Sequence, residues 1–415
     1  MRRTAWVLLA LMLCAPMSAG AFAPGDGTSE LVAGNTASAL DLYTEVRQTA
    51  DGNVLFSPYS IAQALAMTYA GAGGETAAQM AQALSFRLPP PALHEAFRKL
   101  NADLVARGNA KSDPEKGETA RGLRIANALW GEQTYPVSSS YSAQVEQYYG
   151  ARLQKSDFVN APEEARGQIN DWVARQTEDR IQNIVPERAI TRDTRLVLAN
   201  AIWFSSEWQS RFDPSATEDG AFFLPDGTTA TVPFMFQRTY LPYARGDGFQ
   251  AIDFPFAGSE FSFTVILPDE GQLDAFEQGL DTDTLNAALG PLTSTDVRVY
   301  LPKFKFEFGA SLEQTLQALG MTDAFDLWRA DFTGMVDETP PKPLFISDAL
   351  HKAFISVDEN GAEAAAATVT LPVTGGASNE TGPRDVRIDR PFVFAIRDTQ
   401  TGTILFLGRV MNPSA

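Results

Sequence analysis

A run of four alanines lies inside Val357–Thr368, a segment whose neighbours in the sequence have the pattern of β-strands. Alanine has the highest helix propensity of all residues, so this composition by itself predicts a helix. The strand patterns on either side, Leu344–Val357 before it and Val386–Ile396 and Thr403–Val410 after it, disagree with that prediction. The turn-rich stretch Pro372–Pro383 then separates the alanines from the next strand. Because long loops inside compact domains are uncommon and usually functional, we expect a functional loop here.

The N-terminus has the pattern of a secretory signal peptide. Two arginines precede an apolar run, Ala5–Ala15, which the small residues Ser18-Ala-Gly20 follow. We expect cleavage after Gly20, with Ala23 as the alternative, so that residues 1–20 are the signal peptide. The apolar run is too short to span a membrane, and no later segment reaches that length. The prediction is a secreted protein, extracellular or, in a Gram-negative bacterium, periplasmic.

The composition limits the size of the fold and the kinds of partner. Of 415 residues, 44% are hydrophobic, which supports an extensive core, and no repeat or linker divides the chain. We therefore expect a single domain over residues 21–415. Without Arg2 and Arg3 the mature chain has 31 basic and 51 acidic residues, and 31 − 51 is a net charge of −20. That charge favours a soluble monomer and disfavours nucleic acid or an anionic membrane as a partner.

Thiol and metal chemistry are both disfavoured. The only cysteine, Cys14, lies inside the predicted signal peptide, and Leu13 before it does not suit a lipoprotein anchor. The mature chain would then have no disulfide and no thiol nucleophile. The only histidines, His94 and His351, are too few for a His-rich metal site, and His94 is interpreted as a surface residue of a helix. We expect no cofactor.

Periodicity predicts a mixture of helices and strands, an α+β fold. Helices are predicted over Ser29–Thr49, Ser60–Tyr69, Glu75–Leu84, Leu88–Leu104, Tyr141–Tyr149, Pro162–Arg180, Leu273–Leu289 and Ala310–Leu319. Further strands are predicted at Leu123–Trp130, Thr194–Phe204, Phe249–Phe256, Glu260–Leu267 and Val297–Phe308. Thr194–Phe204 is almost continuously apolar, as expected of a strand that is buried on both faces.

Several motifs occur in the order of one protein family. They are Asn53-Val-Leu-Phe-Ser-Pro-Tyr-Ser-Ile61, Thr194-Arg-Leu-Val-Leu-Ala-Asn-Ala-Ile-Trp-Phe204 with Trp208, Leu301-Pro-Lys-Phe304, Leu316-Gln-Ala-Leu-Gly320, His351-Lys-Ala-Phe354, Glu359-Asn-Gly-Ala-Glu-Ala-Ala365, Arg390-Pro-Phe-Val-Phe394 and Leu407-Gly-Arg-Val-Met-Asn-Pro413. On these motifs, which lie in order between Asn53 and Pro413, the sequence resembles the serpins over roughly residues 28–413. The resemblance implies three β-sheets, eight or nine helices and an exposed reactive loop over residues 359–385. It also implies a metastable protease inhibitor rather than an enzyme.

In serpins the cut reactive loop enters a β-sheet as a new strand. Gly361 offers a pivot for this movement, and no proline occurs in the loop before Pro372. About ten new backbone hydrogen bonds at roughly 1 kcal/mol each would drive insertion. The competing interpretation is a plain exposed turn or helix. With a period of two, the side chains of this hinge fall on one face formed by Ala362, Ala364, Ala366 and Thr368, without large or charged groups, and another formed by Glu363, Ala365 and Ala367.

The hinge also distinguishes kinds of serpin. The resemblance implies that members without inhibitory activity often carry bulky, charged or proline residues here, so the alanines favour an inhibitor. Glu359 resembles the family's acid that pairs with the lysine of Leu-Pro-Lys, here Lys303, and we predict a Glu359–Lys303 salt bridge at the top of the sheet. Trp208 matches the family's tryptophan at the breach, where insertion starts. From the sequence alone, Trp208 is equally well an aromatic core residue.

Ser57, Ser60, Asn200 and His351 form a second constellation. A serine with a histidine is the pair that many hydrolases use. However, Ser57 lies in Phe-Ser-Pro at a helix start, and the chain has no Gly-x-Ser-x-Gly motif. In serpins the matching positions form the shutter, a hydrogen-bond cluster beneath the strands that part during insertion. We adopt the shutter interpretation and assign no catalytic residue.

The scissile bond is predicted only within a window. Counting forward from Glu359 by the family spacing places it at Gly375–Gly376, after Thr374, whereas counting back from Arg390 places it at Glu380–Thr381. The counts disagree because the loop is longer than usual, and we prefer the forward count because the inserted arm needs a set length. Small residues in the window favour an elastase-like or subtilisin-like serine protease with a small, apolar pocket. A glutamate-specific protease is the alternative at Glu380, and a cysteine protease stays open.

These observations rank three functions. The first is a secreted suicide inhibitor of serine proteases, in which the enzyme is trapped as an acyl-enzyme. The second is a serpin that binds a ligand or serves a structural role without inhibition. The third is a hydrolase that uses Ser57.

Overall fold

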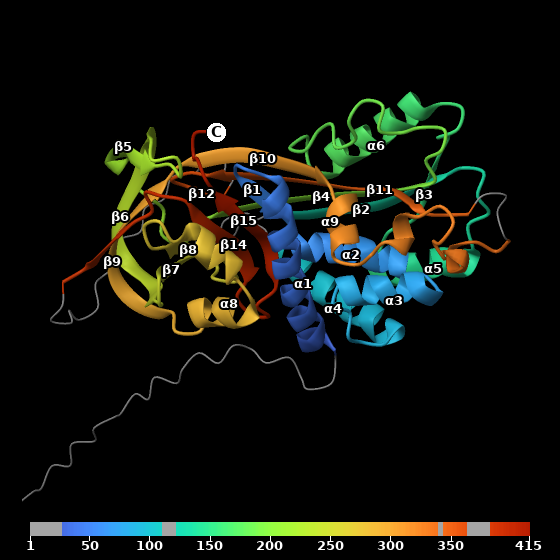
Figure 1. Ribbon diagram of the computed structural model, residues 1–415. Coiled ribbons are helices and arrows are strands. Elements are labelled where there is room, and N and C mark those ends of the chain that lie inside the picture. Colours follow the sequence, from blue (N-terminus) through green and yellow to red (C-terminus); the bar gives the residue numbers. More distant parts are fainter. Residues whose placement is uncertain (1–26, 110–121, 339–342, 363–381) are drawn as a thin grey trace, which may run out of the picture.

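The computed structural model describes residues 27–109, 122–338, 343–362 and 382–415. These residues form nine α-helices and fifteen strands, in agreement with the predicted α+β fold (Figure 1). None of the described helices combines the length and the apolar character that crossing a membrane requires. The helices are α1 (Thr28–Thr49), α2 (Pro58–Tyr69), α3 (Gly74–Ala83), α4 (Pro90–Gly108), α5 (Ser139–Tyr149), α6 (Pro162–Gln176), α7 (Leu273–Gln278), α8 (Thr282–Leu289) and α9 (Glu313–Ala318).

A six-stranded sheet forms the centre of the molecule, with the strand order β10-β11-β12-β4-β2-β3. Its two middle long strands, β4 and β11, run parallel and are paired from Leu196–Ile346 to Ile202–Ala353. The short strand β12 lies between them where both strands end. The strands are β2 (Gly122–Glu132), β3 (Gln154–Ser156), β4 (Leu196–Glu207), β10 (Phe304–Ser311), β11 (Ile346–Val357) and β12 (Gly361–Ala362).

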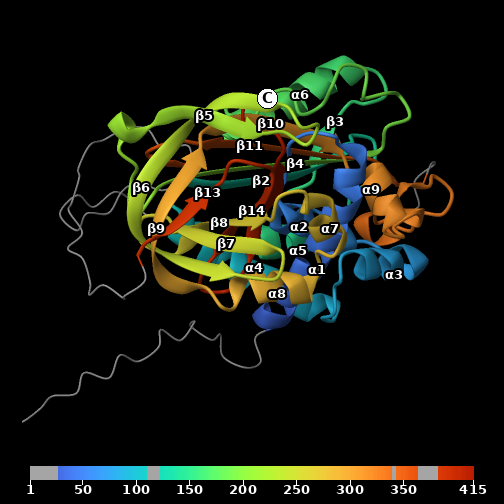
Figure 2. The ribbon, with the colours of Figure 1, turned by 60° about the vertical axis from the view of Figure 1, so that its left-hand side comes forward.

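The other described strands form a nine-stranded, strongly bent sheet (Figure 2). Strand β6 pairs with β9 over most of its length and with β7 only at Tyr243–Arg245, so it joins two groups of strands. The three sheets that the resemblance implies are present once this joined sheet is divided at β6. Its strands are β1 (Val54–Phe56), β5 (Glu218–Phe223), β6 (Thr229–Arg245), β7 (Phe249–Pro255), β8 (Phe261–Pro268), β9 (Thr293–Pro302), β13 (Arg384–Arg387), β14 (Phe392–Asp398) and β15 (Ile404–Val410).

Helices cover both faces of the six-stranded sheet, and this explains the apolar sequence of β4. Figure 1 shows α6 on one side of the sheet and α2 to α5 on the other. Ile169 and Val173 of α6 pack with Val197 and Ala199 of β4 in one core cluster. Ile202 of β4 belongs instead to the core on the opposite face, with residues of α2 and α4. The prediction of a strand buried on both faces is confirmed.

Two predicted elements are each divided in the structure. The strand predicted at Val297–Phe308 is two strands, β9 and β10, which belong to different sheets and meet at Lys303. The helix predicted at Leu273–Leu289 is α7 and α8, because Asp281 accepts a hydrogen bond from the backbone N–H of Thr284 (2.8 Å) and starts a new helix. Local periodicity continues across both breaks, so the sequence pattern did not reveal them.

Two further predictions differ from the structure at element boundaries. The strand predicted at Val386–Ile396 is β13 and β14, with Pro391, which lacks an N–H donor, in the connection. The helix predicted at Ala310–Leu319 begins only at Glu313, because Ala310 and Ser311 pair with β11. Strands β1, β3, β5 and β6 were not predicted.

His94 is buried, so its interpretation as a surface residue was wrong. Its side chain is 0% exposed, and its Nδ1 lies 2.6 Å from the hydroxyl of Tyr149. The rings of Tyr69 and Tyr148 also lie within ring-contact distance. Burial lowers the pKa of His94 to about 4. The tyrosines of α5 that surround it are distant in the sequence, and therefore the helical pattern of α4 did not identify this inner face.

Candidate functional site

The hinge enters the six-stranded sheet at the C-terminal ends of β4 and β11. Gly361 and Ala362 pair antiparallel with Glu207 and Ser206 of β4, and Ala362 also pairs with Val357 of β11. Ala362 is 1% exposed and lies in the main core cluster. A Cβ atom on Gly361 would lie 2.0 Å from the carbonyl oxygen of Ser206, so only glycine fits this position. Gly361 and Ala362 therefore occupy a strand position between β4 and β11.

Glu359 is held by two side chains from other parts of the chain. Lys303 Nζ lies 2.7 Å from its Oε2, and the hydroxyl of Thr217 donates to its Oε1 at 2.8 Å. Burial by itself raises the pKa of Glu359, but these hydrogen bonds outweigh burial and hold the pKa below its ordinary value. The side chain of Lys303 is 34% exposed, so the ion pair contributes about 1 kcal/mol or less to stability. The predicted contact between Glu359 and Lys303 is present.

Trp208 connects the end of β4 to the chain just before β12. Its indole Nε1 donates to the carbonyl oxygen of Asp358 (2.8 Å), and its backbone N–H donates to the carbonyl oxygen of Asn360 (2.8 Å). The indole ring is stacked on Phe256, with ring centroids 4.9 Å apart. Trp208 is 3% exposed. It is thus an aromatic core residue that also contacts the chain just before β12, and its role as the breach tryptophan stays a prediction.

Ser57, Ser60, Asn200 and His351 come together beneath the middle of β4 and β11. His351 Nε2 accepts the backbone N–H of Ser57 (3.2 Å), and His351 Nδ1 is hydrogen-bonded to the side-chain oxygen of Asn200. Asn200 Nδ2 donates to the hydroxyl of Ser60 (2.6 Å). His351 and Asn200 are also direct register partners of the two parallel strands. The cluster therefore joins β4, β11 and the start of α2.

The same geometry argues against a hydrolase triad. The hydroxyl of Ser57 accepts the backbone N–H of Ser60 (3.2 Å) and caps the N-terminus of α2. His351 faces the backbone of Ser57 rather than its hydroxyl, and burial lowers the pKa of His351 to about 3. A general base must reach the proton that it removes. The histidine is therefore placed to hold strands and helix together.

Sequence reasoning missed Asn127, which belongs to this cluster. Asn127 of β2 lies opposite Asn200, and its side chain is hydrogen-bonded to Asn200, to Ser60 (3.1 Å) and to Gln63 (2.8 Å). A signal was available, because Ala126-Asn-Ala-Leu-Trp130 repeats the pattern of Ala199-Asn-Ala-Ile-Trp203. The row His351, Asn200, Asn127 thus crosses three adjacent strands.

The remaining candidates lie outside the described residues and stay predictions. They are the hinge residues Glu363, Ala364, Ala365, Ala366, Ala367 and Thr368 and the reactive-bond candidates Thr374, Gly375, Gly376 and Glu380. The predicted signal peptide lies outside them as well. Among the residues that the structure does describe, no group of three or more His, Cys, Asp or Glu side chains is arranged to hold a metal ion.

Comparison with known proteins identifies the family. The family model of serpins, described as serine protease inhibitors, matches residues 33–413. The chain is a serpin. An uncharacterised serpin-like protein of Thermococcus kodakarensis is 39% identical over 374 residues, which are 90% of this serpin and 84% of the relative. The leukocyte elastase inhibitor of Sus scrofa is 38% identical over 394 residues, which cover 92% of this serpin and all of the relative.

Solved structures agree with this assignment. Human thyroxine-binding globulin in complex with thyroxine has a TM-score of 0.81 to this serpin at 28% identity, and the match covers 93% of this chain and 99% of that one. The serpin fold expected from the resemblance is therefore confirmed. The family is described as one of serine protease inhibitors, which is not the description of a hydrolase family.

Removing the lysine at the sheet end is expected to loosen this serpin. Lys303→Ala takes away the partner of the largely buried Glu359 carboxylate, so β12 loses one of its anchors. We expect more polymer or latent form after mild heating, measured by native gel electrophoresis and size-exclusion chromatography. Lys305→Ala removes the same charge from the exposed side of β10 and serves as the control. Equal monomer yields for the two variants would contradict the prediction.

Stability is expected to fall in mild acid because His351 is buried in its neutral form. The folded pKa of about 3 lies below the ordinary value of 6.5, so between these limits the unfolded chain binds a proton that the folded chain does not. This contribution is complete above pH 6.5 and is lost as the pH falls toward 3, by roughly 1.4 kcal/mol per pH unit. Urea unfolding at several pH values measures it. His351→Gln should flatten the pH dependence, and an unchanged slope would contradict the assignment.

Proposed function

We propose that this serpin is a secreted suicide inhibitor of serine proteases. The protease attacks the reactive loop, forms an acyl-enzyme with it, and is then distorted when the arm of the loop enters the six-stranded sheet. One observation carries this proposal: β12 already lies between β4 and β11, as the first two residues of such a strand. The inserted arm would begin at this point.

The arrangement of β4 and β11 supports further insertion. These strands are parallel, and β12 is antiparallel to both. A strand that continued from β12 would separate the parallel pair and replace one ladder by two antiparallel ladders. About ten additional hydrogen bonds at roughly 1 kcal/mol each would contribute on the order of 10 kcal/mol. Ala362 faces the core, so by the strand period Ala364, Ala366 and Thr368 would follow on the same face without a clash.

The side-chain clusters of the site have roles in this movement. The ion pair between Glu359 and Lys303, with N and O 2.7 Å apart, holds the chain just before β12 in place until insertion starts. The hydrogen bond between His351 and Asn200 joins the two strands that insertion must part. These residues, with Ser57 and Ser60, act as the shutter, and Trp208 with Lys303 forms the breach. These few, well-defined contacts keep the sheet closed until cleavage, and insertion then breaks them.

The target is an elastase-like or subtilisin-like protease with a small, apolar specificity pocket. Thr374, Gly375 and Gly376 are small enough for such a pocket, and a relative that shares 38% identity is named as a leukocyte elastase inhibitor. No Lys or Arg occurs between Glu359 and Arg384, which disfavours trypsin-like enzymes. Glu380 supplies the alternative bond for a glutamate-specific enzyme, and a cysteine protease is a further target class.

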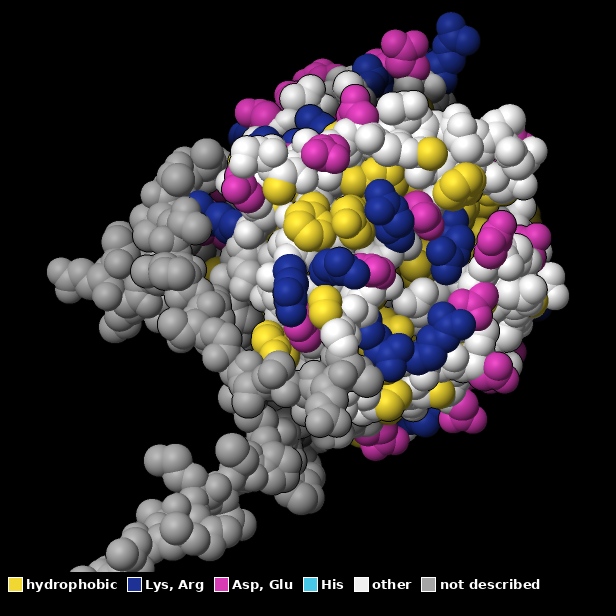
Figure 3. Space-filling view, turned by 90° about the vertical axis from the view of Figure 1, so that its left-hand side faces the viewer, with side chains coloured by type: hydrophobic (Ala, Val, Ile, Leu, Met, Phe, Trp, Pro, Cys, Tyr) yellow, Lys and Arg dark blue, Asp and Glu magenta, His cyan; other side chains and the backbone are white. Residues whose placement is uncertain are grey.

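A protease bound at the loop would lie near the face of β6, β9 and β13. Figure 3 shows basic, acidic and hydrophobic side chains interleaved on this face, in a chain whose formal net charge is −18. Arg387 lies over the ring of Tyr300, 4.1 Å from its centroid, and Arg298 is paired with Asp385 at 2.6 Å. Strand β13, which carries Arg387 and Asp385, begins at Arg384, so the last two residues of the predicted loop 359–385 already lie in this strand. The face thus adjoins the C-terminal side of the loop.

A serpin that binds a ligand without inhibition is the second candidate. It is favoured by the close structural match to thyroxine-binding globulin, a protein of this fold that was solved with a bound ligand. The alanines after Gly361 favour the first candidate, because the resemblance implies bulky, charged or proline residues here in members without inhibitory activity.

One gel distinguishes the two candidates. Pancreatic elastase and subtilisin, each incubated with the purified mature protein, are expected to give a covalent complex that resists SDS, and mass spectrometry of the released C-terminal peptide would locate the bond. Trypsin is the control and should give no complex through this loop. Clean cleavage by elastase, subtilisin and a glutamate-specific protease without any complex would favour the binding role. The N-terminal mass of exported protein tests whether the mature chain starts at Ala21.

A further inference from the structure

Asn360-Gly361 is the only Asn-Gly pair in the chain, and it lies where the hinge enters the sheet. Asn360 occupies the bend between β11 and β12, and Gly361 is the first residue of β12. An asparagine side chain can be attacked by the backbone nitrogen of the next residue, which forms a five-membered ring. Glycine has no Cβ to obstruct this attack. The pair therefore combines a reactive sequence with an asparagine that lies in a bend, just before the ladder begins at Gly361.

The polar contacts around this pair favour the ring closure. Within the part of the chain that the structure describes, no hydrogen bond restrains the side-chain amide of Asn360, which is half-buried. The backbone N–H of Gly361 is held by the carboxylate of Asp358, with Oδ1 3.3 Å from the nitrogen. The same oxygen accepts the N–H of Asn360 at 2.7 Å. A carboxylate thus lies at the proton that Gly361 must lose.

We propose that Asn360 is a site of spontaneous deamidation, assisted by Asp358, and that the reaction inactivates the inhibitor. The nitrogen of Gly361 attacks Cγ of Asn360, a C–N bond forms, and the side-chain amide leaves as ammonia. Asp358 accepts the N–H proton of Gly361 and returns a proton to the departing nitrogen. Water then opens the succinimide at either carbonyl and leaves aspartate or isoaspartate at position 360. The net reaction consumes one water and releases one ammonia.

Isoaspartate does not fit the slot that β12 occupies. It inserts one additional carbon into the backbone between residues 360 and 361. The neighbours of Gly361 leave no room for this, since even a Cβ there would lie 2.0 Å from the Ser206 oxygen and 2.7 Å from Cα of Glu207. The original carbonyl of Asn360, which accepts the N–H of Trp208 (2.8 Å), becomes a free carboxylate. Aspartate at 360 keeps the backbone length but adds a charge beside Asp358 and Glu359.

The modified hinge is therefore expected to withdraw from the sheet and to insert poorly. This second step rests on the proposed inhibitory function. When insertion is slowed, the acyl-enzyme is hydrolysed before the protease is distorted, and the loop is cut as an ordinary substrate. During storage at neutral or mildly alkaline pH, the spontaneous reaction would then convert the serpin from an inhibitor into a substrate, and no modifying enzyme would be needed.

The test compares four full-length proteins that are stored at pH 8, with samples taken over time. They are the wild type, Asn360→Gln, which closes a ring far less readily, Asn360→Asp, and Asp358→Asn, which keeps the hydrogen-bond acceptor but not the base. Isoaspartate is measured by methyltransferase labelling and by mass spectrometry of the tryptic peptide between Lys352 and Arg384. Inhibition is measured as the number of serpin molecules consumed per elastase molecule.

We expect isoaspartate at residue 360 in the wild type and none in Asn360→Gln. In folded Asp358→Asn, isoaspartate should form about 10-fold more slowly than in the wild type. This factor is smaller than the one that a well-placed catalytic base contributes, because the contact between Asp358 and the Gly361 nitrogen is long. In urea, Asp358→Asn and the wild type should react at similar rates. Serpin consumption should rise in step with isoaspartate in the wild type and stay constant in Asn360→Gln. Absence of isoaspartate from the aged folded protein, or its formation without a change in consumption, would overturn the proposal. Fresh protein that forms no complex would overturn the proposed function and the second step with it, while the isoaspartate yield still decides the first.

Discussion

Replacing Ala362 with glutamate is expected to convert the serpin from an inhibitor into a substrate. Ala362 is 1% exposed between β4 and β11, so a glutamate would place an unpaired carboxylate in the core or force β12 out of the sheet. Burying such a charge costs several kcal/mol. About 3 kcal/mol corresponds to roughly a hundredfold change in the ratio of covalent complex to cleaved serpin. The yield of covalent complex with elastase should fall by about that factor, while cleavage of the loop continues.

The matched control is Ala92→Glu, which adds the same charge at an exposed position of α4. It should leave the complex yield unchanged. Densitometry of complex and cleaved serpin on one gel measures both outcomes. Normal complex formation by Ala362→Glu would show that β12 need not stay in the sheet, and it would remove the main support for insertion at this point.

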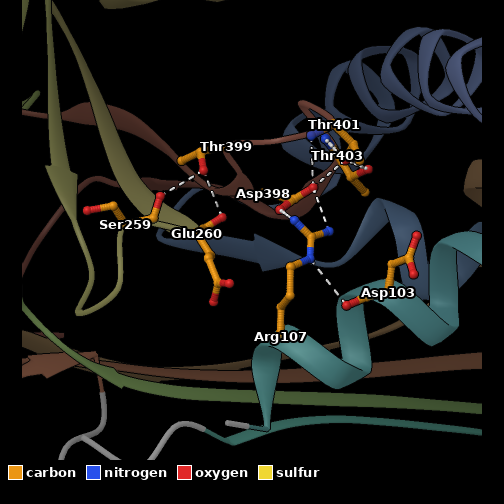
Figure 4. A network of polar contacts seen from close by, with 8 residues as sticks. All are labelled: Asp103, Arg107, Ser259, Glu260, Asp398, Thr399, Thr401 and Thr403. Carbon is orange, nitrogen blue, oxygen red and sulfur yellow. Dashed lines mark hydrogen bonds and ion pairs between the residues drawn. The ribbon is translucent and has the colours of Figure 1, made fainter. Parts of the chain in front are cut away.

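Replacing Asp398 with alanine is expected to lower the free energy of unfolding by about 3–5 kcal/mol, as for other buried ion pairs that lose one partner. Asp398 is 0% exposed and accepts hydrogen bonds from Arg107 Nη1 (2.7 Å) and Nη2 (3.1 Å) and from the backbone N–H of Thr401 (2.9 Å) (Figure 4). The turn that it stabilises is also fixed by Thr399, whose hydroxyl donates to the carbonyl oxygen of Ser259 (2.8 Å). The substitution leaves the Arg107 guanidinium unpaired and largely buried.

An exposed ion pair provides the control for this prediction. The side chains of Arg152 and Glu146 are 71% and 52% exposed, so Glu146→Ala should change the free energy of unfolding by no more than about 1 kcal/mol. Equilibrium unfolding in urea, followed by fluorescence and circular dichroism, measures both variants. If Asp398→Ala were no more destabilising than Glu146→Ala, the connection between α4 and the turn after β14 would be energetically unimportant.

Two parts of the candidate site, the Lys303–Glu359 contact and the cluster around His351, differ in how much of them the sequence predicted. Lys303 was correctly paired with Glu359 through the family motif, yet the strand break that brings Lys303 to the sheet end was not predicted. Ser57, Ser60, Asn200 and His351 were grouped correctly by resemblance. Asn127, which completes their row, was missed although its Ala-Asn-Ala context repeats that of Asn200.

Residues that are distant in the sequence explain what was missed. Arg107 and Asp398 are 291 positions apart, and neither has a local pattern that announces an ion pair. His94 has the neighbours of a surface residue along α4, but Tyr149 of α5 covers it and burial lowers its pKa to about 4. Periodicity reports which face of an element is apolar, not which partner covers it.

Local patterns were sufficient for the α+β class, and the ordered motifs were sufficient for the family. Alternation and helical spacing predicted most elements, and the run from Gly361 to Thr368 without bulky or proline residues predicted a segment suited to become a strand. Only the tertiary structure decided that Gly361 and Ala362 already lie between β4 and β11. Such a position depends on strands from two separate parts of the chain, β4 and the adjoining β11 and β12, and the free energy of their pairing arises only when the fold brings them together.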